Sequence, residues 1–230
     1  TTEEAIVLYL ISRTGFRIGS DTDTLAAQKA FGATTLLGKH VIIKGADISF
    51  SFIGKKGVQI DKTISDPILA RLLGKRKKKD DSPIFQVNDG QVRRYLDTIT
   101  PGNNKFSPKD LRTHLATALA LEEIEKWDIP TTKTGFTKLR KHVAQLVATE
   151  LGNTPAIALK SYIDPQVFTK WEKSLAKQGI KLKKSMYQQD RMVDLYKRMT
   201  EFFETIHFDY FPSNWNELRN YYDDPLYDDE

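Results

Sequence analysis

Tyr162 is the first residue whose position suggests chemistry, because it stands at a predicted junction between helices. A long amphipathic helix is predicted to end at Gly152, and Thr154-Pro155 supplies the N-cap and the first-position proline that begin another. Asp164-Pro165 begins the next helix by the same device. A side chain at such a junction can turn toward a ligand, whereas a lone tyrosine there is more often a half-buried packing residue.

Three cationic side chains could complete a site for phosphodiester cleavage around such a tyrosine. Arg17 follows a buried helix that ends at Gly15, Lys55 lies at the tip of a predicted hairpin, and Arg112 lies near a helix N-terminus, where peptide groups attract anions. A phenolate is a good leaving group, so a covalent tyrosyl link is reversible. Guanidinium groups bridge phosphate oxygens without losing protons. A lysine whose pKa is lowered by neighbouring arginines can protonate the departing sugar oxygen.

Four short motifs, taken in order, resemble the catalytic segments of type IB DNA topoisomerases of the short viral and bacterial kind. They are Phe16-Arg17-Ile18-Gly19, Phe52-Ile53-Gly54-Lys55, Lys109-Asp110-Leu111-Arg112-Thr113, and Gly152-Asn153-Thr154-Pro155 with Lys160-Ser161-Tyr162. Each motif alone is weak. Because all four follow in the family's order across about residues 5 to 167, the resemblance is specific.

This resemblance implies an enzyme that relaxes supercoiled double-stranded DNA by swivelling about a transient nick. It implies that Tyr162 attacks one strand, forms a 3′-phosphotyrosyl link and frees a 5′-hydroxyl, without metal, ATP or another cofactor. It further implies that Arg17 and Arg112 clamp the phosphate while Lys55 protonates the leaving oxygen.

The resemblance also indicates supporting residues. The family often has a histidine where this chain has Asn153, and an amide donates the same hydrogen bond at any pH but cannot act as an acid. Lys109 matches a supporting position in relatives. We expect Lys56, Lys109 and Lys160 to contact DNA.

The charge distribution favours a polyanionic partner. The formal charge of the chain is +5, and residues 223–230 carry five acids and no base, so the remaining residues carry +10. A basic body of this kind suggests nucleic acid before membrane. The longest apolar run, Ala5 to Ile11, is too short to span a bilayer, and no signal peptide is apparent.

The chain has no cysteine and only four scattered histidines, which leaves little from which to build a zinc site. His114 and His142 fall outside the four motifs and are interpreted as ordinary helix residues. We therefore expect no bound metal. We also expect the chain to be a monomer. We expect it to be intracellular and associated with DNA, in the cytoplasm, the nucleoid, a virus particle or the nucleus.

The hydrophobic periodicities predict an α+β fold that is mostly helical and contains a small three-stranded antiparallel sheet. The resemblance implies the catalytic domain of the type IB topoisomerase and tyrosine recombinase kind. Strands are predicted at 41–43, 48–52 and 58–60, and helices at 3–14, 66–73, 89–98, from 107 to beyond 119, up to 151, at 155–161, at 165–177 and up to about 207. The basic run 75–79 is predicted to be a mobile surface loop.

We expect residues 1–167 to form the catalytic core, with the nucleophile near its C-terminal end, and residues 168–222 to form a helical extension packed on it. The extension contains a predicted capping box, Ser185 with Gln188, and precedes the acidic tail 223–230. Relatives carry an N-terminal β-rich clamp domain, which we expect to be absent from this chain.

Two alternatives remain. A tyrosine recombinase or integrase shares the Arg, Lys, Arg and Tyr chemistry, but here Thr113-His114 follows Arg112, where a recombinase has histidine directly, and Ile163-Asp164-Pro165 follows the tyrosine. A non-enzymatic DNA-binding module could keep the same fold without the reaction. The complete catalytic set argues against it.

Overall fold

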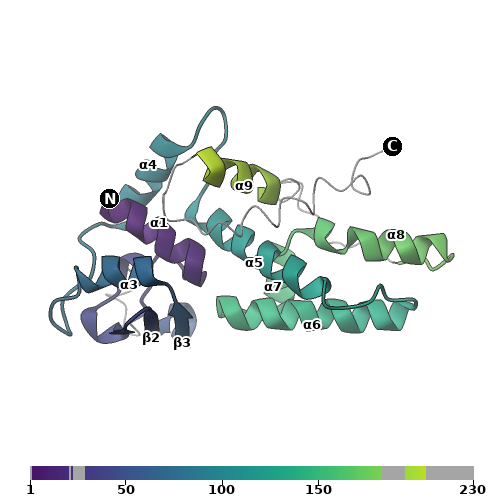
Figure 1. Cartoon of the computed structure of the whole chain (residues 1–230), viewed down its shortest axis with the longest axis horizontal. Helices are drawn as coiled ribbons and strands as arrows, with labels where there is room; N and C mark the ends of the chain where they lie inside the picture. The colour runs from purple at the N-terminus through teal and green to yellow at the C-terminus, as the bar shows by residue number, and fades with distance from the viewer. Residues whose placement is uncertain (1, 21, 23–28, 183–194, 206–230) are drawn as a thin grey trace. The chain divides into compact units, whose positions relative to one another are not determined.

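The computed structural model describes residues 2–20, 22, 29–182 and 195–205, and the chain divides into two compact units. The first unit is Thr1–Arg112 and the second is Thr113–Glu230. Figure 1 labels the α-helices and two of the strands. The sequence did not lead us to expect a division at this point, and the proposed boundary after residue 167 stays a prediction.

The first unit combines a small sheet with helices, as the periodicities predict. Its elements are α1 (Glu3–Thr14), η1 (Ala33–Thr35), η2 (Gly38–His40), β1 (Val41–Lys44), β2 (Asp47–Gly54), η3 (Lys55–Gly57), β3 (Val58–Ser65), α3 (Pro67–Gly74), α4 (Asp89–Ile99) and the start of α5 (Pro108–Ile124). The mostly helical α+β class and the three-stranded antiparallel sheet are confirmed.

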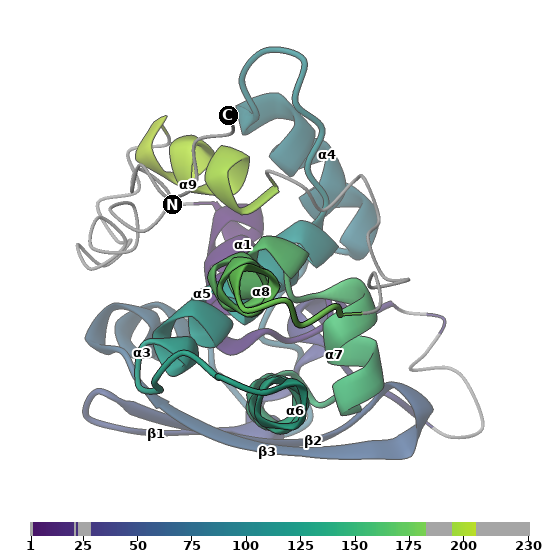
Figure 2. The same cartoon turned by 90° about the vertical axis from the view of Figure 1, so that its right-hand side faces the viewer.

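The sheet has the order β1-β2-β3, and both strand pairs are antiparallel. Figure 2 shows the three strands lying together. Along β2 the side chains of Ile48, Phe50 and Phe52 are buried, while Ser51 between them is exposed. This alternation is the period of two that a strand with one covered face requires. Helix α3 packs against β2 and against α1.

Asp66 ties α1 to α3 through one buried carboxylate. Its Oδ1 accepts hydrogen bonds from the first backbone amides of α3, and its Oδ2 accepts from the hydroxyl of Tyr9 at 2.8 Å and from Nε of Arg13 at 2.9 Å. Burial and the bond to Asp66 raise the pKa of Tyr9, so its hydroxyl remains a donor. One side chain therefore caps a helix and joins it to another.

Hydrogen bonds fix part of the basic run 75–79. The ammonium of Lys77 donates to the carbonyl of Val41 at 2.6 Å, and the guanidinium of Arg76 donates to the carbonyl of Leu72 at 3.2 Å. Lys75, Lys78 and Lys79 are exposed. Arg76 and Lys77, two of the five cations of the run, therefore make structural hydrogen bonds, in contrast to the predicted mobile surface loop.

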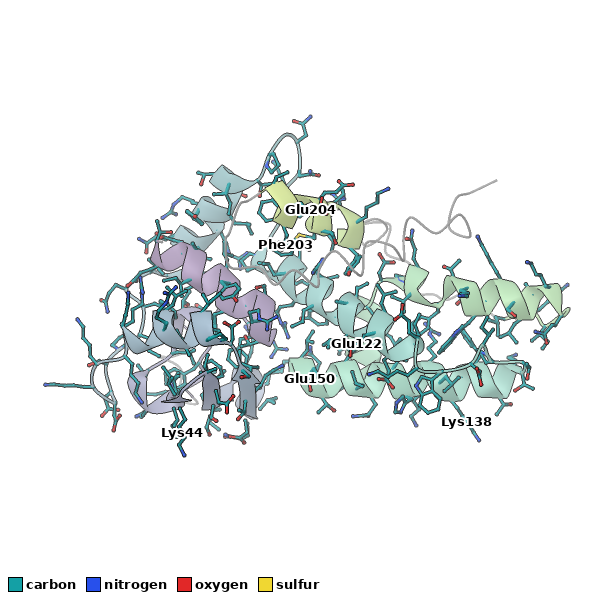
Figure 3. The ribbon with its side chains drawn as sticks, viewed as in Figure 1. Lys44, Glu122, Lys138, Glu150, Phe203 and Glu204 are labelled. Carbon is teal, nitrogen blue, oxygen red and sulfur yellow. The ribbon has the colours of Figure 1, made fainter. Side chains whose placement is uncertain are left out.

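The second unit is helical in its described part. Its elements are the remainder of α5, α6 (Lys133–Leu151), α7 (Pro155–Ser161), η4 (Pro165–Phe168), α8 (Thr169–Lys177) and α9 (Leu195–Thr205). The predicted helix over 165–177 is present, although its first turn is a 3-10 helix. The exposed face of α6 carries Lys138 and Glu150 (Figure 3).

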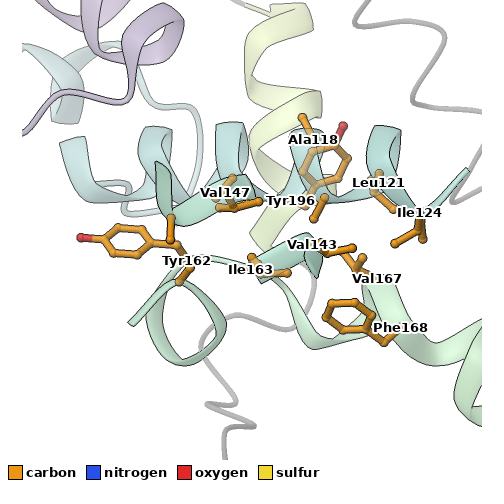
Figure 4. Packing of buried hydrophobic residues seen from close by; sticks show 14 of the residues in the cluster. Ala118, Leu121, Ile124, Val143, Val147, Tyr162, Ile163, Val167, Phe168 and Tyr196 are labelled. Atoms are coloured by element: carbon orange, nitrogen blue, oxygen red, sulfur yellow. The ribbon is translucent and has the colours of Figure 1, made fainter. Parts of the chain in front are cut away.

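A cluster of buried side chains holds these helices together (Figure 4). It draws Leu121 and Ile124 from α5, Val143 and Val147 from α6, and also includes Phe168. Helix α9 packs through aromatic contacts, because the ring of Tyr196 stacks on that of His114. The predicted Ser185–Gln188 capping box, residues 206–222 and the acidic tail lie outside the described residues.

Among the residues that the structure describes, none of the helices combines the length and the apolar character needed to cross a membrane.

Candidate active site

The first unit contains a pocket of about 250 Å³ with a cationic lining. The side chains of Arg17, Lys55, Arg93, Lys109 and Arg112 line it, and its one carboxylate is that of Asp89. The remaining lining residues are Ile18, Gly19, Ser20, Phe31 and Pro108. Five cations against one acid make the pocket suited to an anion such as phosphate.

Arg17 follows directly from an aromatic anchor. The ring of Phe16 is buried and meets the rings of Phe50 and Phe52 edge-on, each at 5.0 Å between centroids. Such pairs contribute packing energy and fix orientation. The anchor joins the end of α1 to the covered face of the sheet, so the next residue, Arg17, has a defined place.

A short segment, residues 31–34, connects the Arg17 turn to the hairpin that carries Lys55. The amide of Phe31 donates to the carbonyl of Ile53 at 2.8 Å, and the amide of Ala33 donates to the carbonyl of Arg17 at 2.8 Å. The backbone of Arg17 and that of Ile53, two residues before Lys55, are therefore bonded to the same short segment.

The same connection requires glycine at two positions. A Cβ atom added to Gly32 would lie 2.5 Å from the N and Cα atoms of Gly19 and 2.6 Å from the carbonyl oxygen of Arg17. Gly19 itself has a φ of +89°, which side chains disfavour. The sequence motif drew attention to Gly19, but Gly32 was missed because nothing in its own neighbourhood marks it.

Arg112 is 3% exposed and lies in the first turns of α5. Its Nε donates to the carbonyl oxygen of Gly15 at 2.6 Å, and Gly15 is the C-cap of α1. A helix C-terminus carries partial negative charge, so it suits a cation. The start of α5 is fixed by Asp110, whose Oδ2 accepts from the amide and hydroxyl of Ser107, both at 2.7 Å.

Lys55 is exposed at the hairpin tip, where η3 replaces a simple two-residue turn. Lys56, next to it, has a φ of 65° and is the one non-glycine residue with positive φ in the described part of the chain. Lys55 lines the pocket, whereas Lys56 is not among the lining residues. Lys55, the lysine predicted to deliver an ammonium from the hairpin tip, therefore lies at the pocket, and its role stays a prediction.

The structure also adds two residues that the sequence reasoning missed. Arg93 and Asp89 line the pocket from α4, and Nε of Arg93 lies 3.7 Å from Oδ2 of Asp89. A pair of opposite charges four residues apart on a helix is common, so the sequence carried no signal for either residue. Lys109, which the motifs did indicate, is exposed and lines the pocket from α5.

Tyr162 belongs to the second unit, where it is the C-cap of α7. The hydroxyl of Thr117 accepts from the amide of Asp164 at 3.1 Å and donates to the carbonyl of Tyr162 at 3.4 Å, so α5 fixes the backbone around the tyrosine. In Figure 4 the ring of Tyr162 points away from the other labelled side chains of the cluster, with its hydroxyl outermost. The predicted junction between helices is confirmed.

Asn153 and Lys160 lie on the same segment of the second unit. Gly152 ends α6 with a φ of 61°, and the amide of Asn153 donates to the carbonyl of Ala148 at 2.8 Å, which fixes the turn before α7. Lys160 is exposed in the last turn of α7. Of the eight predicted site residues, the pocket contains Arg17, Lys55, Lys109 and Arg112.

In the described ranges no cluster of three or more histidine, aspartate or glutamate side chains could hold a metal ion. His114 is fully buried, and burial lowers its pKa to about 3, so it is neutral at ordinary pH. His142 hydrogen-bonds with Glu123 at 3.0 Å. Both histidines have structural contacts that agree with the interpretation as helix residues.

A family model described as the catalytic core of eukaryotic DNA topoisomerase I matches residues 1–192. The chain belongs to this family. The matched range contains all four motifs, and the topoisomerase I resemblance that they indicated is confirmed. In this member of the topoisomerase I family, the four matched cations come from the turn after α1, the hairpin tip and the start of α5.

One relative of this topoisomerase I catalytic core is the DNA topoisomerase 1B of Acanthamoeba polyphaga mimivirus. The two sequences are 24% identical over 176 residues, which cover 69% of this chain and 52% of the relative. The chain therefore spans about half the length of that viral protein.

Proposed function

We propose that this chain is the catalytic core of a type IB DNA topoisomerase, which relaxes supercoiled double-stranded DNA through a transient 3′-phosphotyrosyl intermediate. The observation that carries the proposal is the cationic pocket, because it gathers Arg17, Lys55, Lys109 and Arg112 from three separate segments. The family membership supports the same reaction. A protein with that activity acts on DNA, so we infer that this chain is associated with DNA.

In the proposed reaction the oxygen of Tyr162 attacks the phosphorus of one DNA strand, and its proton leaves to water. A phosphorus–oxygen bond to the tyrosine forms as the bond to the 5′-oxygen breaks. Arg17 and Arg112 bind the non-bridging oxygens, whose negative charge grows in the transition state. The anchored position of Arg112, bonded to Gly15, keeps it aimed at one place throughout.

Lys55 gives its proton to the departing 5′-oxygen, and the reverse transfer restores the strand. It reaches the pocket from a hairpin tip, whereas the two arginines come from the turn after α1 and from α5. Lys109 adds charge at the pocket wall, and Asn153 donates a hydrogen bond from its amide. Lys56 and Lys160 contact the DNA backbone nearby.

The test is covalent trapping on end-labelled duplexes. The chain is mixed with DNA, the reaction is stopped with detergent, and the label that migrates with protein is recorded. We expect the fragment carrying the original 5′ end to be retained, because the 3′-phosphate is the one that joins the tyrosine. Retention of the other fragment would contradict the proposed polarity, and DNA binding with no adduct would contradict catalysis.

A second assay measures relaxation of supercoiled plasmid in excess chelator beside strand exchange between two duplexes. We expect relaxation to persist in chelator, because arginines bind the phosphate where other enzymes use a metal. Strand exchange without relaxation would instead favour a recombinase.

A further inference from the structure

Arg93 is the cation of the pocket to which no part of the proposed reaction assigns a role. Arg17, Arg112 and Lys55 are assigned to the phosphate that is cleaved, and Lys109 supports them. A phosphodiester carries one negative charge, so the pocket holds more positive charge than that phosphate alone needs. Arg93 enters from α4, an element that carries none of the four motifs.

The position of α4 is well determined by its own sequence. Asn88 and Gln91 form a capping box, in which each side chain accepts from the other's amide at 3.0 Å. Val92 and Leu96 are buried, and α4 packs against α1, the helix that leads to Arg17. Arg93 follows the buried Val92 directly, so it lies at the edge of the packed face, beside the pocket.

The guanidinium of Arg93 is held only loosely. Its Nε lies 3.7 Å from Oδ2 of Asp89, which is too long for a hydrogen bond, and the two side chains are 49% and 42% exposed. Exposed ion pairs of this kind contribute little. A phosphate that accepted two hydrogen bonds from the guanidinium would therefore displace the contact with Asp89 at small cost.

We propose that Arg93 binds a DNA phosphate adjacent to the cleaved one and so fixes which phosphate of the strand occupies the pocket. The weak contact with Asp89 is given up when the phosphate binds. Arg93 is then a substrate-binding residue that acts on register and affinity, while the proton transfer and the attack belong to Lys55 and Tyr162. This inference rests on the proposed function, because it assumes a DNA strand in the pocket.

Arg93→Ala is compared with the unchanged chain in a single-turnover assay, on a duplex cut short so that the freed strand departs. The DNA concentration at half-saturation should rise by about tenfold to a hundredfold, the usual loss for a hydrogen bond to a charged group. The cleavage rate at saturating DNA should stay within about threefold of the original. The salt dependence of binding should weaken by about one counterion, a slope change of ~0.9.

Arg94→Ala is the matched control. Arg94 is exposed on the same helix, carries the same charge and does not line the pocket. It should change the half-saturating concentration much less than Arg93→Ala does. Equal effects of the two substitutions would show that Arg93 acts by general attraction alone, and would overturn the proposal.

A second experiment locates the contact on the DNA. Single phosphates on either side of the cleavage site are replaced by neutral methylphosphonates, one duplex at a time, and each is bound by the unchanged chain and by Arg93→Ala. At one flanking position the loss of affinity caused by the methylphosphonate and the loss caused by Arg93→Ala should not add. Each change alone already removes the contact between Arg93 and that phosphate. Additive losses at every position would overturn the proposal.

Arg93→Lys separates fold from contact. It keeps the charge but loses the two-pronged geometry, so it should melt at the same temperature as the unchanged chain and bind with an intermediate loss. A lowered melting temperature in both Arg93 variants, together with additive losses, would assign Arg93 to the fold. Failure of the proposed function is distinct, because the unchanged chain would then form no covalent adduct on unmodified DNA.

Discussion

The two units of this chain hold their functional residues by different means. In the first unit, Arg17 and Arg112 are placed by backbone hydrogen bonds and by a close approach of two glycines. In the second, Tyr162 ends a short helix beside an apolar cluster and is fixed through Thr117. The proposed phosphate-binding groups therefore depend more on polar contacts between distant segments, and the proposed nucleophile more on the packing of helices.

This difference indicates that anion binding and nucleophilic attack can be lost separately. The residues that line the cationic pocket all belong to the first unit, so we expect removal of the Tyr162 hydroxyl to leave most of its affinity for a phosphate. Substitution of Tyr162 should consequently remove chemistry while binding remains, whereas substitutions elsewhere can remove chemistry, binding or stability according to the role of the residue.

The largest effect is expected from Tyr162→Phe. The substitution removes one oxygen atom and leaves the pocket intact, so the covalent adduct should disappear while DNA affinity stays within about threefold. Adduct yield after detergent and affinity by titration measure the two properties. Adduct formation by this variant would place the nucleophile elsewhere, and loss of binding would break the division between the units.

Lys55→Ala should slow cleavage by about 10²- to 10⁴-fold, the usual contribution of a general acid. A substrate whose bridging 5′-oxygen is replaced by sulfur has a leaving group that needs no proton, so the variant should recover most of its rate on it.

Lys56→Ala, one residue along the same tip, is the control and should show neither the loss nor the rescue. If Lys55 only steered DNA, the variant would cleave both substrates more slowly by the same factor, and low salt would restore the cleavage rate. That result would move the search for the acid to Lys56 or Lys109.

The sequence predicted most of the fold because the elements carry local signals. The N-cap and proline at Thr154-Pro155 and the alternation along β2 both gave elements that the structure confirms. Three of the four motifs also gave four of the five cations of the pocket. Local patterns of this kind need no knowledge of distant residues.

What the sequence could not predict depends on contacts between distant segments. The approach of Gly32 to Gly19 and the bond from Arg112 to Gly15 join positions with no shared periodicity. Arg93 was also missed, because its helical pattern alone indicates an ordinary surface residue and only the folded structure places it at the pocket. The division after Arg112 falls inside α5, where a continuous helix hides it.

Asp66→Ala should strongly destabilise the first unit. It removes the cap of α3 and the partner of Tyr9 and Arg13 together, so we expect a loss of about 2–4 kcal/mol in the free energy of unfolding. Asp61→Ala is the control, because that carboxylate is exposed, and it should lower the free energy of unfolding much less than Asp66→Ala does. Denaturant unfolding at pH 7.5 measures both, and equal losses would show that the tie is weak.

His114 should make the stability of the second unit depend on pH. Burial lowers the pKa of His114 to about 3 from an ordinary value of 6.5. Below pH 6.5 the unfolded chain therefore binds a proton that the folded chain refuses, and stability is lost as pH falls from 6.5 toward 3. Between pH 7.5 and pH 5 the loss should be about 2 kcal/mol.

His114→Gln removes this titration while it keeps a group able to bond with Thr200, whose hydroxyl lies 3.1 Å from Nε2 of the histidine. The variant is expected to be less stable at pH 7.5, because the stack on Tyr196 is lost, yet less sensitive to acid. His40, whose pKa is also lowered by burial, should leave a smaller residual dependence. An unchanged slope between pH 7.5 and pH 5 would contradict the assignment.

The smallest effect is expected from Asn153→His, which gives the second unit the residue that the resemblance most often implies there. Asn153→Ala, which should cost about tenfold in cleavage rate, first checks that this position contacts the phosphate.

An amide does not titrate, so position 153 should contribute no pH dependence to the unchanged chain. The histidine should match the amide above pH 7, where either donates one hydrogen bond, and should exceed it below pH 6.5, where the imidazolium adds charge. The rate difference between pH 5.5 and pH 7.5 should stay under about tenfold, measured in a background of saturating DNA. A pH profile identical to that of the unchanged chain would mean that the amide of Asn153 does not reach the phosphate, and that the charge of the pocket in the first unit suffices without it.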